Sequence, residues 1–95
     1  MQTEKQLLHE LYKAIISLET TEECENFLSD LCTINELHAM SQRLQSAKLL
    51  LEGKTYNEVI EQTDISSATL ARVSKCVRHG SGSYARVIKK AEKKN

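Results

Sequence analysis

The sequence contains no proline and only three glycines among its 95 residues. Proline and glycine are the residues that interrupt helices most strongly, so little in this chain breaks a helical backbone. Leucine and isoleucine recur at three- and four-residue spacing between Leu7 and Leu18, which is typical of one apolar helix face. These features predict an all-α protein whose first helix covers residues 4–18.

Three segments combine a threonine with a glutamate three residues later, the capping-box pattern with which helices often begin. They are Thr20–Glu23, Thr33–Glu36 and Thr55–Glu58. Gly53 fits the glycine that follows many helix ends, so a long third helix is expected between the second of these segments and Gly53. The apolar positions expected along this helix are Leu37, Met40, Leu44, Ala47 and Leu51.

Residues Thr55 to Arg78 have the pattern of two short helices joined by a tight turn, which is a helix-turn-helix motif. Five apolar positions are expected to lock the two helices together: Val59, Ile60, Ile65, Leu70 and Val73. Ser66 is the expected N-cap of the second helix, so the start of that helix should be exposed. A glycine- and serine-containing break, His79–Ser83, follows, and Tyr84–Lys93 is expected to form the last helix.

The second helix of this motif begins with small hydroxyl and alanine side chains and ends with basic ones. Short side chains let a helix approach base edges in the major groove closely, so the motif predicts contact with double-stranded DNA. The expected DNA-binding residues are Thr55, Asn57, Ser66, Ser67, Ala68, Thr69, Ala71, Arg72 and Lys75. The pattern also fits two packed core helices with a serine-rich cap, and the motif by itself does not separate these interpretations.

Charge is distributed unevenly, although the whole chain is neutral. Residues 1–52 carry four Lys and Arg against nine Asp and Glu, a net charge of −5, whereas residues 53–95 carry nine against four, a net charge of +5. A local basic excess attracts the phosphate backbone of a nucleic acid. An ordinary solvated basic tail is one alternative, and a helical adaptor whose basic surface docks an acidic protein is another.

A chain of this length forms one structural domain, and alone it buries a modest fraction of its surface. A homodimer is therefore expected, with a helical dimerisation body over residues 1–54, a DNA-reading head over residues 55–79 and a C-terminal helix over residues 80–95. No apolar run approaches the roughly 20 residues of a membrane helix, and the N-terminus lacks the layout of an export signal. Three cysteines, an odd number, fit a reducing compartment, so a cytoplasmic protein without membrane partners is expected.

Signatures of catalysis are missing from the sequence, which has no glycine-rich phosphate loop, no nucleophile elbow and no evident carboxylate pair. Cys76 and His79 have the spacing of two zinc ligands, but no second pair stands nearby. Cys24 and Cys32 are eight residues apart on one predicted helix, too far for a shared tetrahedral site, and apolar packing is their expected role. We therefore expect no enzyme, no metal site and no bound cofactor.

Three segments resemble the tryptophan repressor family, in particular its YerC/YecD branch: Thr33–Arg43, Leu49–Gly53 and Ser66–Ser74. The resemblance covers residues 31–78, and the Leu-Leu-Leu-Glu-Gly helix end and the Ala-Thr-Leu-Ala-Arg-Val-Ser run are its most specific parts. It implies a six-helix chain in an intertwined homodimer from which two helix-turn-helix heads protrude. It also implies a transcriptional repressor that binds operators, with its heads in successive major grooves about 34 Å apart.

The same resemblance implies a small-molecule corepressor pocket that is matched in part. Four positions correspond to pocket residues of the family: Thr33, Arg43, Arg72 and Cys76. The family glycine that leaves room for an indole ring corresponds to Val73, whose β-branched side chain would fill that space, so tryptophan is not the expected ligand. Other roles stay open, namely an ion pair of Arg43 with Glu36 or with an acid of a neighbouring chain, and a phosphate contact for Arg72.

Overall fold

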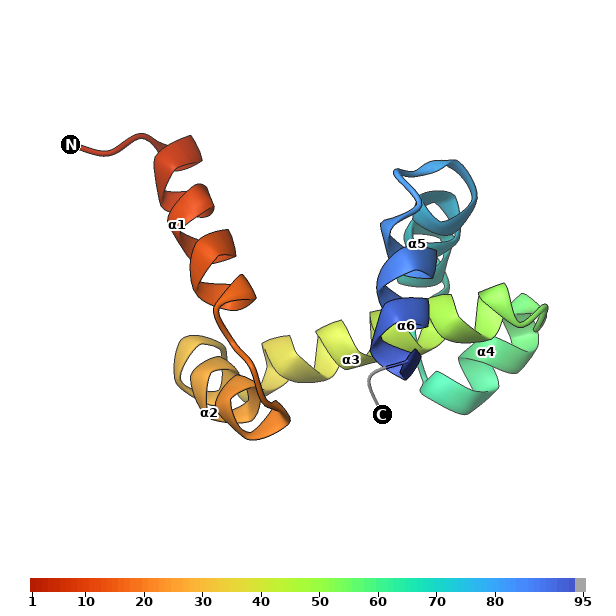
Figure 1. Cartoon of the computed structure of the whole chain (residues 1–95). Coiled ribbons are helices and arrows are strands. Elements are labelled where there is room, and N and C mark those ends of the chain that lie inside the picture. The colour runs from red at the N-terminus through yellow and green to blue at the C-terminus, as the bar shows by residue number, and fades with distance from the viewer. Residues whose placement is uncertain (94–95) are drawn as a thin grey trace. The chain divides into compact units, whose positions relative to one another are not determined.

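The computed structural model describes residues 1–93, which form six α-helices and no strand (Figure 1). The helices are α1 (Glu4–Ile16), α2 (Thr21–Leu31), α3 (Ile34–Leu51), α4 (Tyr56–Thr63), α5 (Ser67–His79) and α6 (Ser83–Lys93). The prediction of an all-α, six-helix chain with a helix-turn-helix is confirmed. Only small differences in helix ends occur, since α1 ends at Ile16 and α6 already begins at Ser83.

The chain divides into two compact units, residues 1–37 and the residues from His38 onward. The first unit holds α1 and α2, and none of its residues is buried. Its exposed large apolar side chains are Met1, Leu7, Leu8, Tyr12, Ile15, Ile16, Leu31 and Ile34. A stable helical unit normally buries its apolar stripe, so this one lacks a core of its own. The division of roles between residues 1–54, 55–79 and 80–95 stays a prediction.

The capping boxes at Thr33 and Thr55 form as predicted. The Thr33 N–H donates to Glu36 Oε1 over 2.7 Å, and the Glu36 N–H donates to Thr33 Oγ1 over 3.1 Å. The corresponding distances between Thr55 and Glu58 are 3.0 and 3.2 Å. Each of these glutamates has a pKa below the ordinary glutamate value. The larger cause is the hydrogen bond from the backbone N–H of Thr33 to Glu36, or of Thr55 to Glu58, and the smaller cause is the hydrogen bond with the side chain of the same threonine. Both helices therefore begin with an ionised carboxylate that completes the cap.

The third predicted box, at Thr20, is only half formed, so that part of the prediction is wrong. Thr20 Oγ1 accepts the Glu23 N–H over 3.0 Å, but the Glu23 carboxylate accepts the N–H of Glu19 over 3.1 Å instead of that of Thr20. A further box, which was not predicted, joins Thr3 and Gln6 at the start of α1. Glutamine can replace glutamate in this pattern, so the Thr3 box follows the same rule as the others.

Gly53 ends α3 as predicted, with a left-handed φ of 91°. The Gly53 N–H donates to the carbonyl oxygen of Leu50, and the Lys54 N–H donates to that of Leu49, both over 3.0 Å. This pair of bonds is a Schellman motif, which satisfies two carbonyls that the end of a helix leaves unpaired. Because Thr55 already caps α4, the connection between α3 and α4 is short and hydrogen-bonded at both ends.

The second unit has an apolar core built around the helix-turn-helix. Its buried residues are Ala47 and Leu49 of α3, Val59 of α4, Ile65 of the turn, and Leu70 and Val73 of α5. The partly buried residues packed against them are Leu50, Ile60, Val77, Tyr84 and Ile88. All five positions predicted to lock the motif belong to this cluster, although Ile60 is only half-buried. α6 packs against α5 and closes the core on that side.

Most of the apolar positions predicted along α3 lie outside the face that the single chain buries. Its buried residues are Ser46, Ala47 and Leu49. Only Ala47 of the predicted apolar stripe is among them, whereas Met40, Leu44 and Leu51 are 38%, 47% and 44% exposed. These three side chains, which we call the α3 seam, recur at helical spacing. The helix therefore carries a second apolar face that the single chain leaves open.

Candidate nucleic-acid interface

The turn between α4 and α5 decides where the second helix of the motif begins. Asp64 adopts a left-handed backbone conformation after α4, with φ 62° and ψ 20°. Ser66 caps α5 as predicted, because its Oγ accepts the Thr69 N–H over 3.2 Å. The same Oγ donates to Thr69 Oγ1 over 2.9 Å, which leaves the hydroxyl hydrogen of Thr69 available to an outside acceptor.

One face of α5 is buried and the other is open. Leu70, Val73 and Ser74 point into the core of the second unit. The exposed residues of α5 are Ser67, Ala68, Ala71, Arg72, Lys75, Cys76, Arg78 and His79. Small side chains form the start of this exposed face, and cationic ones follow one turn later. The helix thus presents a narrow surface with adjacent positive charge, which is the shape and charge that a major groove admits.

Eight of the nine predicted DNA-binding residues are exposed, and Thr69 is half-buried. Seven of the nine lie on α5 or at its N-cap, so the structure brings them together at one helix. Thr55 and Asn57 lie instead at the start of α4, where Thr55 Oγ1 accepts the Glu58 N–H and serves as a cap. Their contact with DNA stays a prediction.

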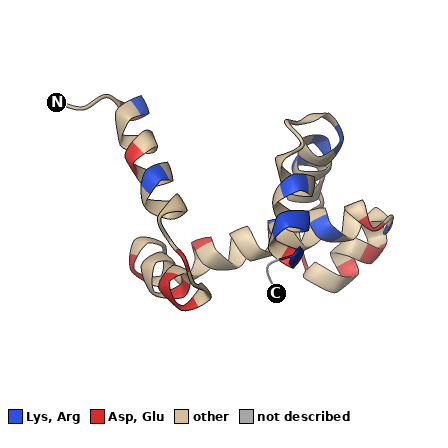
Figure 2. Ribbon diagram, viewed as in Figure 1, with Lys and Arg blue, Asp and Glu red and all other residues tan. Residues whose placement is uncertain are grey.

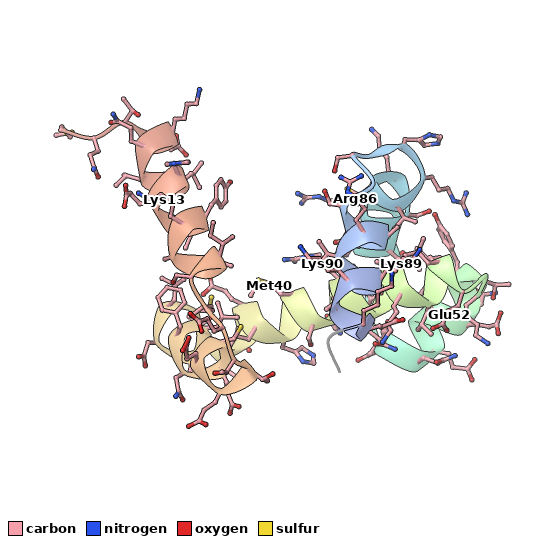
Figure 3. All side chains as sticks on the ribbon, in the orientation of Figure 1. Lys13, Met40, Glu52, Arg86, Lys89 and Lys90 are labelled. Atoms are coloured by element: carbon pink, nitrogen blue, oxygen red, sulfur yellow. The ribbon has the colours of Figure 1, made fainter. Side chains whose placement is uncertain are left out.

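Basic side chains concentrate on α5 and α6 (Figure 2). Within residues 1–93 the ion pairs are Lys13–Glu10, at 3.8 Å, and Lys48–Glu92, at 3.9 Å. Glu92 is the one acid of α5 and α6, and it is paired with α3, so the cations of α5 have no acidic partner in the described chain. Three basic side chains of α6 extend outward in Figure 3: Arg86, Lys89 and Lys90. Lys94, which contributes to the basic excess of the sequence, lies outside the described residues.

Three of the four predicted ligand-binding residues belong to the second unit. Arg43 is half-buried on α3, and Arg72 and Cys76 are exposed on α5. Thr33 belongs to the first unit, where its hydroxyl caps α3. The Glu36 carboxylate accepts the Thr33 N–H, and the ion pair considered for Arg43 stays a prediction. Ligand binding by these residues stays a prediction.

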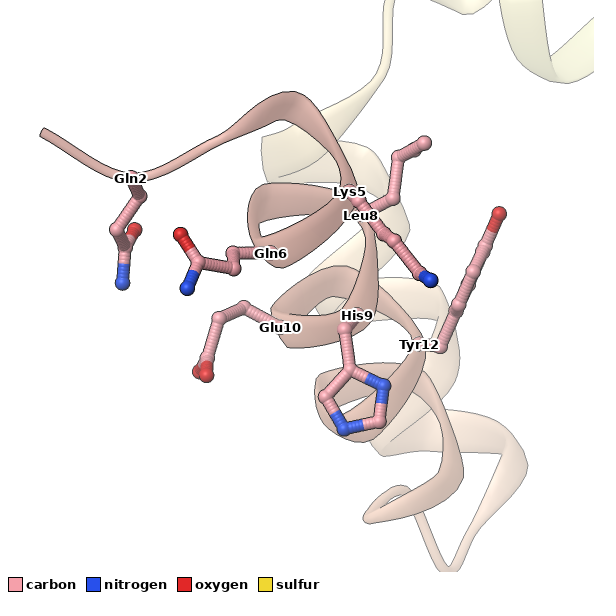
Figure 4. Close-up of a pocket in the computed structure, with 7 residues that line it drawn as sticks. All are labelled: Gln2, Lys5, Gln6, Leu8, His9, Glu10 and Tyr12. Atoms are coloured by element: carbon pink, nitrogen blue, oxygen red, sulfur yellow. The ribbon is translucent and has the colours of Figure 1, made fainter.

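An open groove runs along α1 (Figure 4). Its lining residues are Gln2, Lys5, Gln6, Leu8, His9, Glu10 and Tyr12. All of them come from one helix and the residue stretch before it, so this groove is an uncovered helix face rather than an enclosed pocket. It resembles no catalytic cleft, because a cleft needs walls from more than one element.

Other classes of site find little support in the part of the chain that the structure describes. Residues 1–93 contain no group of three His, Cys, Asp or Glu side chains that could hold a metal ion. The expectation that Cys24 and Cys32 share one helix is wrong, because Cys32 follows α2 as its C-cap in an extended conformation. None of the described helices is long and apolar enough to cross a bilayer.

Three polar residues that were not predicted join α3 to the end of α4: Gln42, Ser46 and Thr63. Ser46 has no exposed surface and lies beside Ala47 in the core. Gln42, Ser46 and Leu49 follow one another at helical spacing, so the serine and glutamine occupy positions on the inner face of α3 where apolar residues are usual. Polar residues at positions where helical spacing predicts apolar ones are therefore the sequence signal that could have identified Gln42 and Ser46.

Comparison with known proteins places the chain in a family. The family model for the Trp repressor protein matches residues 6–92. YerC of Bacillus subtilis (strain 168), an uncharacterised protein, is 44% identical over 77 residues, which is 81% of this chain and 74% of YerC. The family model covers the helix-turn-helix and the long third helix, and both comparisons confirm the resemblance inferred from the sequence.

Two solved structures are also similar. The crystal structure of a TrpR-like protein from Eubacterium eligens ATCC 27750 is 39% identical with a TM-score of 0.86, covering 92% of this chain and 90% of that one. The crystal structure of a Trp repressor candidate from Staphylococcus aureus is 40% identical with a TM-score of 0.87, covering 97% and 95%. Proteins of this kind are DNA-binding regulators and not enzymes. The chain belongs to the Trp repressor protein family.

Proposed function

We propose that the protein is a sequence-specific transcriptional repressor that binds double-stranded DNA as a homodimer. The single observation that carries this proposal is the open face of α5, where Ser67, Ala68 and Ala71 precede two cations that are in no ion pair within residues 1–93, Arg72 and Lys75. Short side chains let the helix enter the major groove, and the cations contact the phosphates beside it. α6 also exposes small and basic side chains, among them Ser83, Ala85 and Arg86, but only α5 is the second helix of the helix-turn-helix.

The homodimer is supported by apolar surface that one chain does not cover. The first unit buries none of its residues, and the α3 seam of Met40, Leu44 and Leu51 is between a third and a half exposed. Exposed apolar patches of this kind mark interaction sites. A second copy of the chain offers the same helices, so self-association buries both sets at once. Two paired chains carry two α5 helices, as an operator with two half-sites requires.

A small-molecule corepressor other than tryptophan is part of the proposal. Of the two arginines that match the family pocket, Arg43 is the one available for an anionic or carboxylate ligand, because Arg72 is assigned to a phosphate and Arg43 is in no ion pair within residues 1–93. Val73 is 2% exposed and packs in the core with Leu70 and Ile65, so its side chain occupies volume that an aromatic ring would need. We therefore expect a ligand smaller than an indole.

The experiment is a selection of bound duplexes from a random library, with and without a panel of small metabolites. Sedimentation velocity on the same protein measures the association state. A repressor of this type should enrich one motif with two related halves, sediment as a dimer, and lose affinity steeply as salt rises. No enriched motif at low salt, together with capture of acidic proteins, would instead favour the helical adaptor that docks an acidic partner.

A further inference from the structure

Three polar side chains connect α3 to the end of α4 in a part of the second unit that is otherwise apolar. Gln42 Nε2 donates to the main-chain oxygen of Thr63 over 3.0 Å, and Ser46 Oγ donates to Thr63 Oγ1 over 3.4 Å. Thr63 is the last residue of α4, so its carbonyl has no partner within that helix. Gln42 therefore caps α4 from a different helix.

The Thr63 hydroxyl uses all of its hydrogen-bonding capacity. It donates to the carbonyl oxygen of Val59 over 2.8 Å, accepts from Ser46, and accepts the Ile65 N–H over 3.3 Å. A hydroxyl has one donor and two acceptor positions, and all three are occupied. Ile65 lies in the turn directly before Ser66, the N-cap of α5. One hydroxyl therefore joins α3, the last turn of α4 and the turn that leads into α5.

Stability alone does not explain a polar group in this place. Ser46 and its neighbour Ala47 are both 0% exposed. An alanine at position 46 would need no partner, whereas a buried hydroxyl is costly unless it is hydrogen-bonded. Hydrogen bonds depend on direction and apolar contacts do not, so the three residues restrict the angle between α3 and the end of α4 more tightly than packing does.

We propose that Gln42, Ser46 and Thr63 are positioning residues for DNA recognition. The inference rests on the proposed function, because it assigns to these residues the task of holding α5 at one angle from α3. α3 also carries the seam proposed to join two copies, so the three residues link the dimer interface to the reading helix. Both reading helices of a dimer can meet their grooves together only when that angle is kept.

The expected effect on specific affinity is limited. Without these bonds, α5 would exchange between the angle seen in the structure (held) and other angles (mobile). The net free energy of one hydrogen bond corresponds to about a three- to tenfold change in the ratio of held to mobile populations. Apparent affinity falls with the held fraction, so a dimer whose two helices start from about equal held and mobile populations should lose about fourfold to thirtyfold. Binding to random duplex depends on phosphate charge rather than on helix angle, and should change little.

The test uses the full chain and two pairs of variants. Thr63→Val keeps the β-branched shape and removes the hydroxyl, whereas Thr63→Ser keeps the hydroxyl. Gln42→Ala removes the donor, and Gln62→Ala makes the same change at an exposed position on α4. Affinity for the selected operator and for random duplex is measured by fluorescence anisotropy, well below the melting temperature of each variant.

Thr63→Val and Gln42→Ala should lose about fourfold or more in the ratio of operator to random affinity, and Thr63→Ser and Gln62→Ala should keep the wild-type ratio. A merely structural role would lower the melting temperature and leave this ratio unchanged, which would overturn the proposal. Equal losses on both duplexes would overturn it as well. If Thr63→Val does not fold, the Gln42→Ala variant decides the question with the same readout.

Amide hydrogen exchange without DNA separates this inference from the proposed function. The Ile65 amide should exchange faster in Thr63→Val than in Thr63→Ser, because only the valine variant lacks its acceptor. Equal exchange would show that the hydroxyl does not hold the turn, and the positioning role would fall even if the protein bound DNA. A wild-type protein that prefers no duplex would remove the proposed function, whatever the exchange result.

Discussion

Replacing Arg72 or Lys75 with alanine should reduce the salt dependence of DNA binding, because each side chain is expected to neutralise one phosphate. Both side chains are exposed on α5, and neither has an acidic partner within residues 1–93. Each is therefore free to neutralise one phosphate, which contributes about 0.9 to the slope of log affinity against log salt. A dimer carries two copies, so each substitution should lower the slope by about 1.8, and the double variant by about 3.6.

Anisotropy titrations of a labelled operator between about 50 and 200 mM salt measure this slope. Across that range the affinity defect of a single variant should shrink about twelvefold, because wild-type affinity falls more steeply with salt. Lys13→Ala is the matched control, since Lys13 lies on α1 and already pairs with Glu10 at 3.8 Å. Its slope should equal that of the wild-type protein.

Two results would refute the phosphate assignment. An unchanged slope with unchanged affinity would remove the substituted side chain from the interface. A preserved slope with lost preference at one base pair would make Arg72 a base-reading residue, since arginine contacts guanine through two hydrogen bonds in the major groove.

Leu44→Asp should abolish dimerisation and leave the helix-turn-helix folded, because Leu44 is 47% exposed and outside the core cluster. Sedimentation velocity measures the association state and circular dichroism measures the helix content. A variant that stays dimeric would contradict the proposal that the α3 seam forms the dimer interface. Glu58→Gln should keep its capping box and flatten the acid sensitivity of folding. The folded-state pKa of Glu58 lies below the unfolded value, so the stabilising contribution of its carboxylate is present at neutral pH and is lost as pH falls through the folded pKa. Urea unfolding of both proteins from neutral to acidic pH tests this. If the variant keeps the wild-type pH dependence, the prediction is wrong. Asp64→Gly should stabilise the folded protein by about 0.5 kcal/mol, because the left-handed backbone costs a residue with a side chain about 1–2 kcal/mol, whereas glycine adds only about 0.4–1 kcal/mol of entropy to the unfolded chain. Urea unfolding measures the difference. A lower unfolding midpoint in the variant would show that the aspartate side chain stabilises the turn.

Local features of the structure were predictable from the sequence because their causes lie within a few residues. The caps at Thr33 and Thr55, the glycine stop at Gly53 and the N-cap at Ser66 each depend on side chains no more than three positions away. The core of the helix-turn-helix was predictable for a related reason, since its apolar positions follow helical spacing. The Thr20 box failed because the Glu23 carboxylate had two backbone N–H donors in reach, and spacing does not choose between them.

Features that depend on distant residues were not predictable in this way. The bond between Gln42 and Thr63 joins positions 21 residues apart, and it depends on how α3 and α4 are rotated against each other. The same rotation decides which face of α3 the single chain buries, and periodicity alone did not separate that face from the α3 seam, which contains Leu44 and Met40. An apolar stripe identifies a contact surface, but it does not say whether the contacting helix belongs to the same chain.

The first unit has a consequence for how much of this protein is structured inside a cell. No residue between positions 1 and 37 is fully buried, so in the proposed homodimer the second copy would cover these apolar faces, and pairing between identical chains grows with the square of their concentration. Newly made chains at low abundance would keep these 37 of the 95 residues open to proteolysis. At higher chain concentration the dimer would form and protect the segment. The amount of intact protein would then rise more steeply than its rate of synthesis.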